Sequence, residues 1–317
     1  MPRGRRATAL DRGGAFIGKL IAFAALFLAT AATRGDAPAA FEQLRWTAPG
    51  AERLLLSEQP AACLASDDAP IRSGRALFGT PTLLGGQAAK AGLSCASCHI
   101  NGRDNVHFLL AGVSAVPGTA DVTNSFFSAA RGNGRFDPVV IPDLAKPGKV
   151  SRDPGTRALE FFIRNLIVEE FGGREPTPAM LDALAAYVRA VRPCAGQATA
   201  ARRLEDQLAA IDDGAASVRT MSELGDASGV ALSIAAMRHQ LGLVAERYAA
   251  PGFARDRAAL LAASHRLEAI GDIADAGLLR RGLDGWKRDF DAGLVPRLRG
   301  AAARSLYDPQ RLDRALR

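Results

Sequence analysis

The pentapeptide Cys95-Ala96-Ser97-Cys98-His99 constrains this chain more than any other feature of its sequence. Two cysteines three residues apart, followed directly by a histidine, form the spacing that attaches c-type haem. Each thiol can add to one haem vinyl group, and the adjacent imidazole then binds the iron as its proximal ligand. We therefore expect one covalent haem c held by Cys95 and Cys98, with His99 on the iron. A chance occurrence of the pattern is the alternative.

Two other roles of a closely spaced cysteine pair fit this sequence less well. A redox dithiol is expected near a βαβ pattern, and a structural zinc site requires two further ligands close by. The sequence around Cys95 and Cys98 offers neither. The motif therefore favours haem attachment over both alternatives.

The other two cysteines of the chain, Cys63 and Cys194, bracket the haem motif. In an oxidising compartment such a pair can form a disulfide. The chain-entropy model assigns a bridge across so long a loop up to about 5 kcal/mol of stabilisation. We expect this bridge to join the two ends of the haem region, and two separate thiols are the alternative.

The N-terminus has the pattern of a signal peptide. Basic residues occur up to Lys19, and an apolar run of thirteen residues, 20–32, follows and ends in small residues. The run is shorter than the roughly twenty residues that cross a bilayer, and cleavage near Ala31 fits the small-residue rule. We expect residues 1–31 to direct export to the periplasm. An uncleaved membrane anchor is the alternative, since residues 15–17 could extend the run.

The net charge of +7 does not indicate nucleic-acid binding. Residues 1–31 carry five basic side chains and one acidic one, so +4 of the charge lies there and +3 lies in the exported remainder. Two haem propionates would reduce that remainder to about +1, and no block of like charge follows the signal segment. We expect an exported redox protein as partner, no nucleic acid, and membrane association only if the N-terminal segment is retained.

Composition changes twice along the chain. Residues 32–60 are rich in Ala and Pro and are expected to form a linker or short extension. Residues 61–195 combine Gly- and Pro-dense loops with a few periodic segments and are predicted to form the haem domain. Residues 196–317 have few prolines and are predicted to form a second, helical module packed as a bundle. The predicted fold class is all-α: a cytochrome c-like haem domain with long loops, followed by a helical-bundle domain.

Helical periodicity predicts the main packing faces. In the haem region one helix is expected after Asp153, with a stop at Gly172, and a closing helix from Thr177 as N-cap to Pro193. The faces of these two helices and three stripes of the helical module are assigned to the core. They comprise Leu159, Phe162, Ile163, Leu166 and Ile167; Leu181, Leu184, Val188 and Val191; Leu204, Leu208 and Ile211; Ile234, Met237, Leu241, Val244 and Tyr248; and Leu279, Leu283, Trp286 and Phe290.

Four stretches carry a resemblance to a known family. They are GRALFGTPTLLGGQAAKAGLSCASCHINGR, TADVTNSFF, the GRF at 134–136 and the closing PTPAMLDALAAYVRAV. With them, residues 74–191 resemble the C-terminal haem domain of bacterial dihaem cytochrome c peroxidases and their relatives. The resemblance covers a little over a third of the chain, and it implies a haem domain that takes part in redox chemistry.

The chain departs from that family in two ways. The peroxidases use two haems, whereas this sequence has one CxxCH motif, so a complete peroxidase within one chain is not expected. In the family a methionine often lies just before the segment that matches GRF and acts as the distal ligand. Here the corresponding residues are Ala129, Ala130 and Arg131, which do not supply the usual ligand.

The distal ligand decides what the haem can do, because a filled sixth position favours electron transfer and an open one admits peroxide or another small ligand. His107 lies eight residues after His99, and an extended segment of that length spans about 26 Å, enough to round the porphyrin edge. Met180, in the first turn of the closing helix, is a second candidate, and an open or water-bound site is a third. Met221, Met237, His239 and His265 are expected to be structural.

Other residues are weaker candidates for haem contacts. Arg103 and Arg131 could pair with the propionates as planar donors, although a solvated surface position explains most arginines in such a sequence. Phenylalanine side chains could form the apolar haem wall, and core packing explains them equally well. These are Phe126, Phe127, Phe136 and Phe162.

Three functions remain to be distinguished. We expect a monohaem cytochrome that carries single electrons, and we assign no catalytic residue. The alternative is a haem oxidoreductase of peroxidase type with an open distal site. A third possibility is that the helical module tethers the cytochrome to a partner or acts as a sensor.

Overall fold

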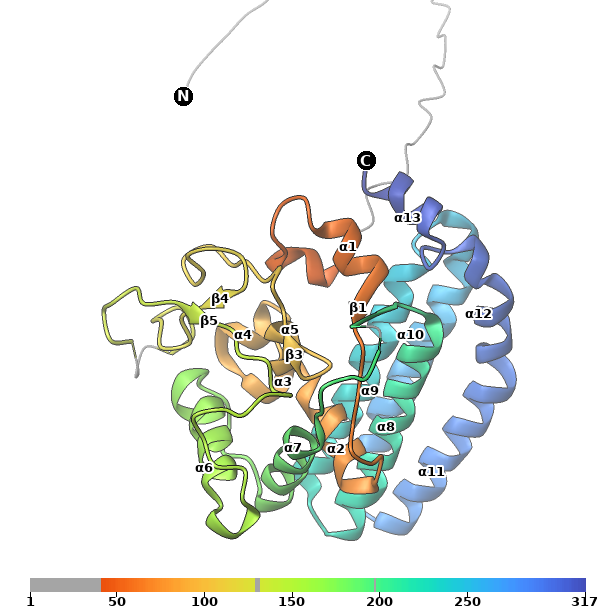
Figure 1. Cartoon of the computed structure of the whole chain (residues 1–317). Helices are drawn as coiled ribbons and strands as arrows, with labels where there is room; N and C mark the ends of the chain where they lie inside the picture. Colours follow the sequence, from red (N-terminus) through yellow and green to blue (C-terminus); the bar gives the residue numbers. More distant parts are fainter. Residues whose placement is uncertain (1–40, 129–131, 197) are drawn as a thin grey trace, which may run out of the picture. The chain divides into compact units, whose positions relative to one another are not determined.

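The computed structural model describes residues 41–128, 132–196 and 198–317. The predicted signal segment 1–31 and the stretch that contains Arg131 lie outside the described residues. Most of the described chain is helical (Figure 1), which confirms the prediction of a mainly α protein. No helix in the described part of the chain has the length and hydropathy needed to cross a bilayer.

The helices fall into a loop-rich first part and a nearly continuous second part. The first part contains η1 (Glu42–Trp46), α1 (Glu52–Ser57), α2 (Ala69–Phe78), α3 (Pro81–Leu84), α4 (Gly86–Lys90), α5 (Cys95–Cys98), η2 (Pro154–Thr156), α6 (Ala158–Asn165), the π-helical turn η3 (Leu166–Glu170) and α7 (Pro178–Ala190). The second contains α8 (Leu204–Glu223), α9 (Ala227–Arg247), η4 (Pro251–Phe253), α10 (Ala254–Gly271), α11 (Ala276–Asp289), η5 (Phe290–Leu294), α12 (Val295–Ala301), η6 (Ala302–Arg304) and α13 (Pro309–Ala315).

Strands are short and form antiparallel pairs. β1 (Glu58–Pro60) pairs with β6 (Thr199–Ala201), β2 (His99–Ile100) with β3 (Arg103–Asp104), and β4 (Thr119–Ala120) with β5 (Val139–Val140). The β1–β6 pair joins segments that are far apart in the sequence.

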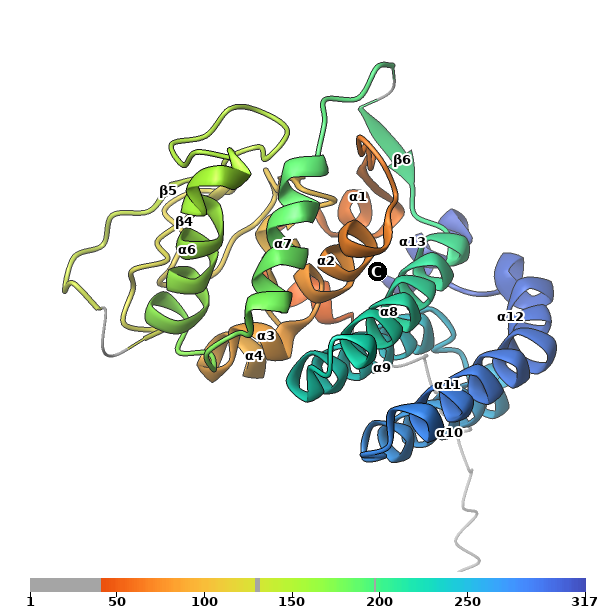
Figure 2. The same cartoon turned by 90° about the horizontal axis from the view of Figure 1, so that it is seen from below.

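The second part is the helical bundle that periodicity predicts. Helices α8 to α11 run side by side, each packed against the next (Figures 1 and 2). Every residue of the three predicted stripes is buried, and Trp286 stacks on Phe290 at the end of the third. Apolar residues at helical spacing form the face that a helix turns toward the core, so the stripes predict which faces of these helices are buried.

Two helices of the first part follow their predicted signals to different degrees. α7 begins as expected, with the Thr177 hydroxyl accepting from the Met180 backbone N–H. α6 begins at Ala158, later than Asp153, which caps the short η2 instead. Of its predicted core face, Phe162 is 43% exposed. That part of the prediction is wrong because α6 docks on α7 through the neighbouring face.

The face that α6 presents to α7 is held by a buried ion pair. Glu160 of α6 lies 2.8 Å from Arg189 of α7 and accepts from both of its terminal nitrogens. Leu159 and Ile167 of the same segment are buried, whereas Phe162 is exposed. Apolar periodicity could not show this, because a charged side chain sets the orientation.

Helix α2 connects the two parts. It packs against α7 on one side and α8 on the other (Figure 2). A Cβ at Gly74 would lie 2.0 Å from the carbonyl oxygen of Ala183, so only glycine permits the close approach to α7. On the α8 side, Arg72 and Arg75 both pair with the buried carboxylate of Asp213, at 2.9 and 2.5 Å.

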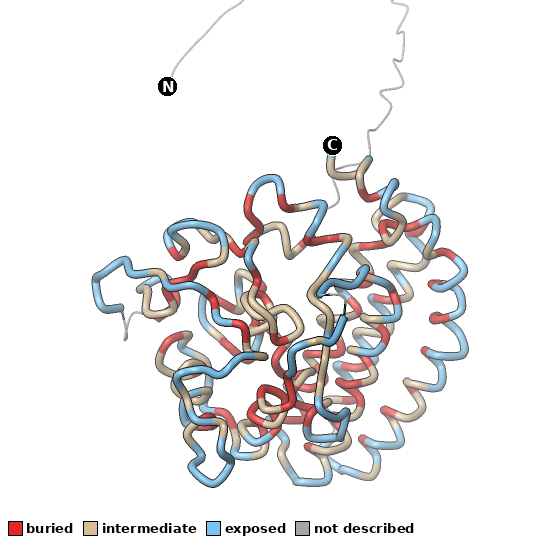
Figure 3. The backbone as a smooth tube through the Cα atoms, viewed as in Figure 1, coloured by how far each residue is buried: buried red, intermediate tan, exposed pale blue. Residues whose placement is uncertain are grey.

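One hydrophobic core extends through both parts. Its buried side chains run from Trp46 to Ala301 and include residues of α2, α7 and the bundle helices. Figure 3 shows the buried backbone positions concentrated where these elements meet. The described residues accordingly belong to one compact unit.

The predicted disulfide is confirmed. Cys63 and Cys194, 131 residues apart, are bonded to each other. The bond lies between two further connections of the same segments, the Leu64–Val191 bridge and the β1–β6 pair. Together these hold the beginning and the end of the loop-rich part against each other.

Candidate functional site

The CxxCH cysteines lie on the single turn of helix α5. At its start the Ser94 backbone N–H donates to the Ser97 hydroxyl, and the Ser97 backbone N–H donates to the Ser94 carbonyl, each at 3.0 Å. Residues three apart on a helix lie on the same face, so Cys95 and Cys98 are neighbours. Both are free thiols.

The chain that leaves α5 is tied back to it by Asn105. The buried Asn105 side chain donates to the Ser97 carbonyl at 2.8 Å, and its backbone N–H donates to the Cys98 carbonyl at 2.9 Å. The β2–β3 hairpin fixes the intervening residues, with His99 opposite Asp104. His99 therefore leaves the helix in a defined position directly after the second thiol.

The imidazole of His99 lies in an environment that keeps it neutral. Burial lowers its pKa to about 4, against the opposing influence of the Pro142 carbonyl and of Asp104 and Asp143. Its Nδ1 is buried without a hydrogen-bond partner. The ring of Phe78 is 6.3 Å away between centroids. A neutral imidazole is the form that binds metals.

The two thiols are likewise desolvated. Burial raises the pKa of both Cys95 and Cys98 to about 12. Yet each of these residues retains some accessible surface, as does His99. The three side chains thus lie deep in the molecule without being completely covered by protein atoms.

Arg103, a predicted propionate contact, is paired within the protein. Its Nε and Nη2 donate to the two carboxylate oxygens of Asp143, each at 2.7 Å. The same bonds from Arg103 hold the pKa of Asp143 below its ordinary value. A guanidinium has five N–H donors, so the pair leaves some of them for another group. Arg131, the other predicted contact, lies outside the described residues.

The two predicted distal ligands are in different surroundings. Met180 is buried in the hydrophobic core at the start of α7. His107 is half-buried in the loop after β3, where its backbone N–H donates to Asn105 and its carbonyl accepts from Ala48. The distal ligand stays a prediction.

The phenylalanines predicted for a haem wall separate into one buried and three exposed side chains. Phe127 is buried and contacts Phe126 and Phe171 edge to face. Phe126, Phe136 and Phe162 are 40 to 56% exposed. Such exposure of three large apolar side chains in one region is a feature to explain, because each leaves apolar surface in water.

The histidines and methionines assigned to structural roles are placed in several ways. Met221 and Met237 are fully buried in the bundle. His239 lies 3.6 Å from Glu42, and burial lowers its pKa to about 4. His265 is exposed beside Glu268. In the described ranges no group of three or more His, Cys, Asp or Glu side chains could hold a metal ion.

Sequence reasoning missed three features of the site. They are the Asn105 ties, the Arg103–Asp143 pair and a polar cavity on the side of α5 that carries Ala96 and Ser97. Each joins residues that no motif or periodicity connects. Asn105 alone had a local signal, since it follows the motif closely and asparagine side chains often bond to nearby backbone.

Comparison of the chain with protein-family models, with curated proteins and with solved structures gave no match.

Proposed function

We propose that this chain is an exported c-type cytochrome that carries single electrons through one covalently bound haem. The observation that carries the proposal is the state of the four cysteines. Cys63 and Cys194 are bonded to each other, whereas Cys95 and Cys98 are free on one helical turn with His99 directly after them. The motif thus has the chemical groups that haem attachment requires.

The residues of the site fit this cofactor. Two adjacent thiols suit the two haem vinyl groups, and a neutral imidazole suits the iron. A histidine that binds a metal generally donates its other ring N–H to a backbone carbonyl or a carboxylate. The Nδ1 of His99 makes no hydrogen bond in the structure, and the Pro142 carbonyl, which acts on the imidazole, is an acceptor of this kind.

The protein's own groups have separate tasks in this proposal. Cys95 and Cys98 would hold the haem, His99 would bind its iron, and Asn105 keeps the attachment turn in place. A haem bound here supplies a one-electron carrier whose potential depends on axial ligation and burial.

The remaining assignments stay part of the proposal. The distal ligand is His107 or Met180, or the position is open, and an open position would favour the peroxidase-type alternative. The signal pattern predicts export to the periplasm. The near-neutral charge expected of the haem-loaded form favours a redox partner that docks through local patches.

Attachment is tested on protein purified from a host that matures c-type cytochromes. The denatured wild type should keep its haem by mass and by absorbance. The variant Cys95→Ala/Cys98→Ala should lose it, and the control Cys63→Ser/Cys194→Ser should keep it. A wild type that carries no covalent haem overturns the proposal.

The function is tested by the absorption spectra of both redox states with added cyanide or carbon monoxide. A low-spin spectrum that ignores both ligands supports electron transfer. His107→Ala and Met180→Leu then show which residue fills the position. A high-spin spectrum that shifts with either ligand, together with peroxide turnover above that of free haem, would replace electron transfer by the peroxidase alternative.

A further inference from the structure

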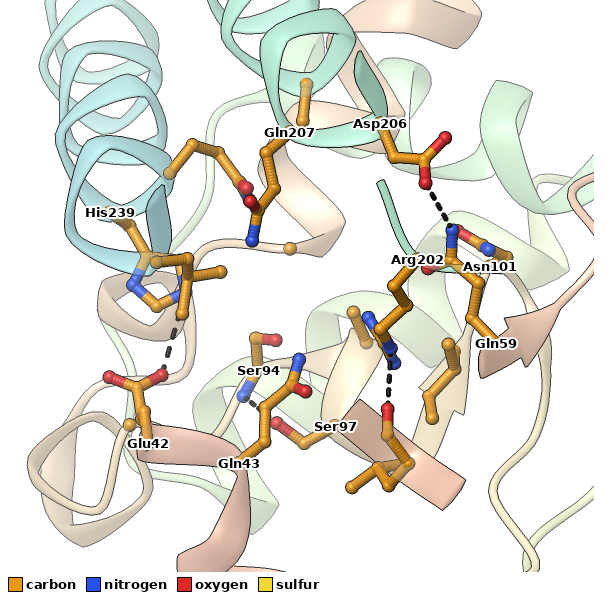
Figure 4. Close-up of a pocket in the computed structure, with 18 of the residues that line it drawn as sticks. Glu42, Gln43, Gln59, Ser94, Ser97, Asn101, Arg202, Asp206, Gln207 and His239 are labelled. Atoms are coloured by element: carbon orange, nitrogen blue, oxygen red, sulfur yellow. Dashed lines mark hydrogen bonds and ion pairs between the residues drawn. The ribbon is translucent and has the colours of Figure 1, made fainter. Parts of the chain in front are cut away.

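A polar cavity lies directly behind the attachment turn. Its volume is about 190 Å³, and Ser94, Ala96 and Ser97 of the turn form part of its wall. The other walls come from η1, from the segment after β6 and from helices α8 and α9. Figure 4 shows polar side chains from all these elements around one open space. Since one water needs only about 10–15 Å³ of such volume, the cavity has room for a small molecule.

Arg202, which lines this cavity, has a buried hydrogen-bond donor without a partner. Its backbone N–H donates to the Ser57 carbonyl, and its Nε donates to the carbonyls of Leu55 and Glu58 at 2.6 and 3.0 Å. These bonds fix the guanidinium in place. Its Nη2 is nevertheless buried without a hydrogen-bond partner. A buried charged donor without an acceptor costs about 1–3 kcal/mol or more.

A second buried arginine adds to the positive charge. Arg247 also lines the cavity, and its terminal nitrogens donate to the backbone carbonyls of Leu306 and Leu56. Burial, and next the charge of Arg247, lower the pKa of Arg202 to about 10. Both guanidinium groups therefore face neutral acceptors, although a charged group is stabilised best by an opposite charge.

The acidic residues of the lining are already engaged. Asp206 accepts from the Gln59 side chain at 3.2 Å and from the Arg203 backbone N–H at 2.8 Å. Glu42 lies beside His239, and burial raises its pKa to about 7. Among the described residues neither carboxylate forms a hydrogen bond or ion pair with Arg202, and only the charge of Asp206 acts on it from a distance. The cavity thus has a surplus of positive charge at Arg202.

The rest of the lining offers neutral hydrogen-bonding groups. Gln43 and Gln207 point toward each other across the space (Figure 4), and Gln207 also accepts from the hydroxyl of Tyr307. An amide side chain can donate and accept, so these groups suit hydroxyls. An inorganic ion would use Arg202 but would leave most of the cavity and the amides without a partner.

We propose that this cavity binds a small hydroxylated organic dicarboxylate, with one carboxylate on Arg202 and its hydroxyl group and second carboxylate on the side chains of Gln43 and Gln207. The site is separate from the haem-binding residues and does not depend on the proposed redox function. Its position against Ser94 and Ser97 places a ligand behind the turn that carries Cys95 and Cys98.

The test uses malate as the probe, with its neutral diamide malamide and inorganic phosphate for comparison. Binding is followed by calorimetry and by the rise in melting temperature of the full chain. We expect malate to bind the wild type and to bind Arg202→Met at least about tenfold more weakly, since charge-assisted hydrogen bonds are the strong ones. The control is Arg304→Met, which removes an exposed arginine outside the cavity and should bind malate normally.

A second variant guards against misfolding of Arg202→Met. Gln43→Leu keeps the Arg202 guanidinium and its hydrogen bonds to backbone carbonyls. It should weaken the binding of malate several-fold. The proposal is overturned if malamide binds as well as malate, if Arg202→Met keeps full affinity, if phosphate alone binds, or if none of the probes binds at millimolar concentration. Because these readouts do not involve the iron, their failure leaves the proposed function untouched.

Discussion

In the helical region every residue of the three predicted stripes is buried, from Leu204 to Phe290. In the loop-rich region, by contrast, Phe126, Phe136 and Phe162 remain substantially exposed. The helical region is stabilised by many apolar contacts spread along α8 to α11, each of modest size. The loop-rich region depends on a few specific connections: a disulfide, a glycine at a helix crossing and buried ion pairs. Single changes should therefore matter more in the loop-rich region.

The largest effect is expected from the disulfide. Cys63→Ser/Cys194→Ser should lower the free energy of unfolding by up to about 5 kcal/mol, because the unfolded chain is no longer closed across a long loop. Urea unfolding measures the change. The two tryptophans serve as separate probes, since Trp46 precedes the bridged segment and Trp286 lies in α11.

The two tryptophan signals test whether loss of the disulfide affects the loop-rich region more than the helical region. We expect the Trp46 transition of the variant to move to lower urea than the Trp286 transition, each followed in a background that lacks the other tryptophan. Equal shifts of both would show that the shared core transmits the loss completely, and the contrast between the regions would then be wrong.

The next effect concerns the crossing of α2 and α7. Gly74→Ala should destabilise by about 3 kcal/mol, because its Cβ would meet backbone atoms of Ala183 and the Cβ of Tyr187, at 2.0 and 2.8 Å. Backbone cannot move aside without separating the two helices. Thermal and urea unfolding measure the loss.

A glycine of the bundle provides the matched control. A Cβ at Gly214 of α8 would meet the Met237 side chain at its Cγ, an atom that a change of rotamer can move. Methionine adapts readily, and alanine is favoured over glycine in a helix by about 1 kcal/mol. Gly214→Ala should therefore cost less than about 1 kcal/mol. Equal losses at the two positions would contradict the view that the regions differ.

Sequence alone accounts well for the buried faces of the helical region and for the proximity in sequence of Cys95, Cys98 and His99. Periodicity identifies residues such as Leu208 and Leu283 because a helix can bury one face only. The spacing of Cys95 and Cys98 predicts a haem-attachment motif, whereas their common face follows only from the helical turn of the structure. The sequence could not predict which residues meet when they lie far apart along the chain. The two arginines that meet Asp213, and the union of Gln43, Arg202 and His239 in one cavity, depend on how whole segments pack.

A smaller effect concerns two carboxyl groups where the N-terminal segment meets the bundle. Glu246 of α9 accepts from the Glu42 backbone N–H at 3.0 Å, and burial raises the pKa of both to about 7. The folded state therefore binds more protons than the unfolded state between about pH 4.5 and 7, so these groups lower stability as pH rises through that interval. The free energy of unfolding of Glu246→Gln should exceed that of the wild type by about 1–3 kcal/mol at pH 8. Near pH 4.5 the two values should be equal.

Urea unfolding at the two pH values checks this difference. His239 has an opposite dependence, because its lowered pKa favours the folded state as pH rises through its titration, but it is present in both proteins and cancels. The control is Glu223→Gln, which removes the charge of an exposed carboxylate paired with Arg280. It should change the free energy of unfolding by less than about 0.5 kcal/mol at either pH. A Glu246→Gln protein that gains nothing at pH 8 would contradict the burial of this carboxyl.

The smallest effect is expected at Thr177 and Asp226, the N-cap residues of α7 and α9, which are hydrogen-bonded to each other. The Thr177 hydroxyl caps α7 by accepting from Met180, and it also donates to the carboxylate of Asp226. Asp226 in turn caps α9 by accepting from the Gly229 backbone N–H at 2.8 Å. Thr177→Val should lose about 1 kcal/mol, the ordinary cost of an N-cap, whereas Thr177→Ser keeps the hydroxyl and should stay within a few tenths. If Asp226→Asn, which keeps a capping oxygen for α9, makes the loss in Thr177→Val smaller, the two caps act as one unit. If the two losses of unfolding free energy are strictly additive, the N-caps of α7 and α9 act independently.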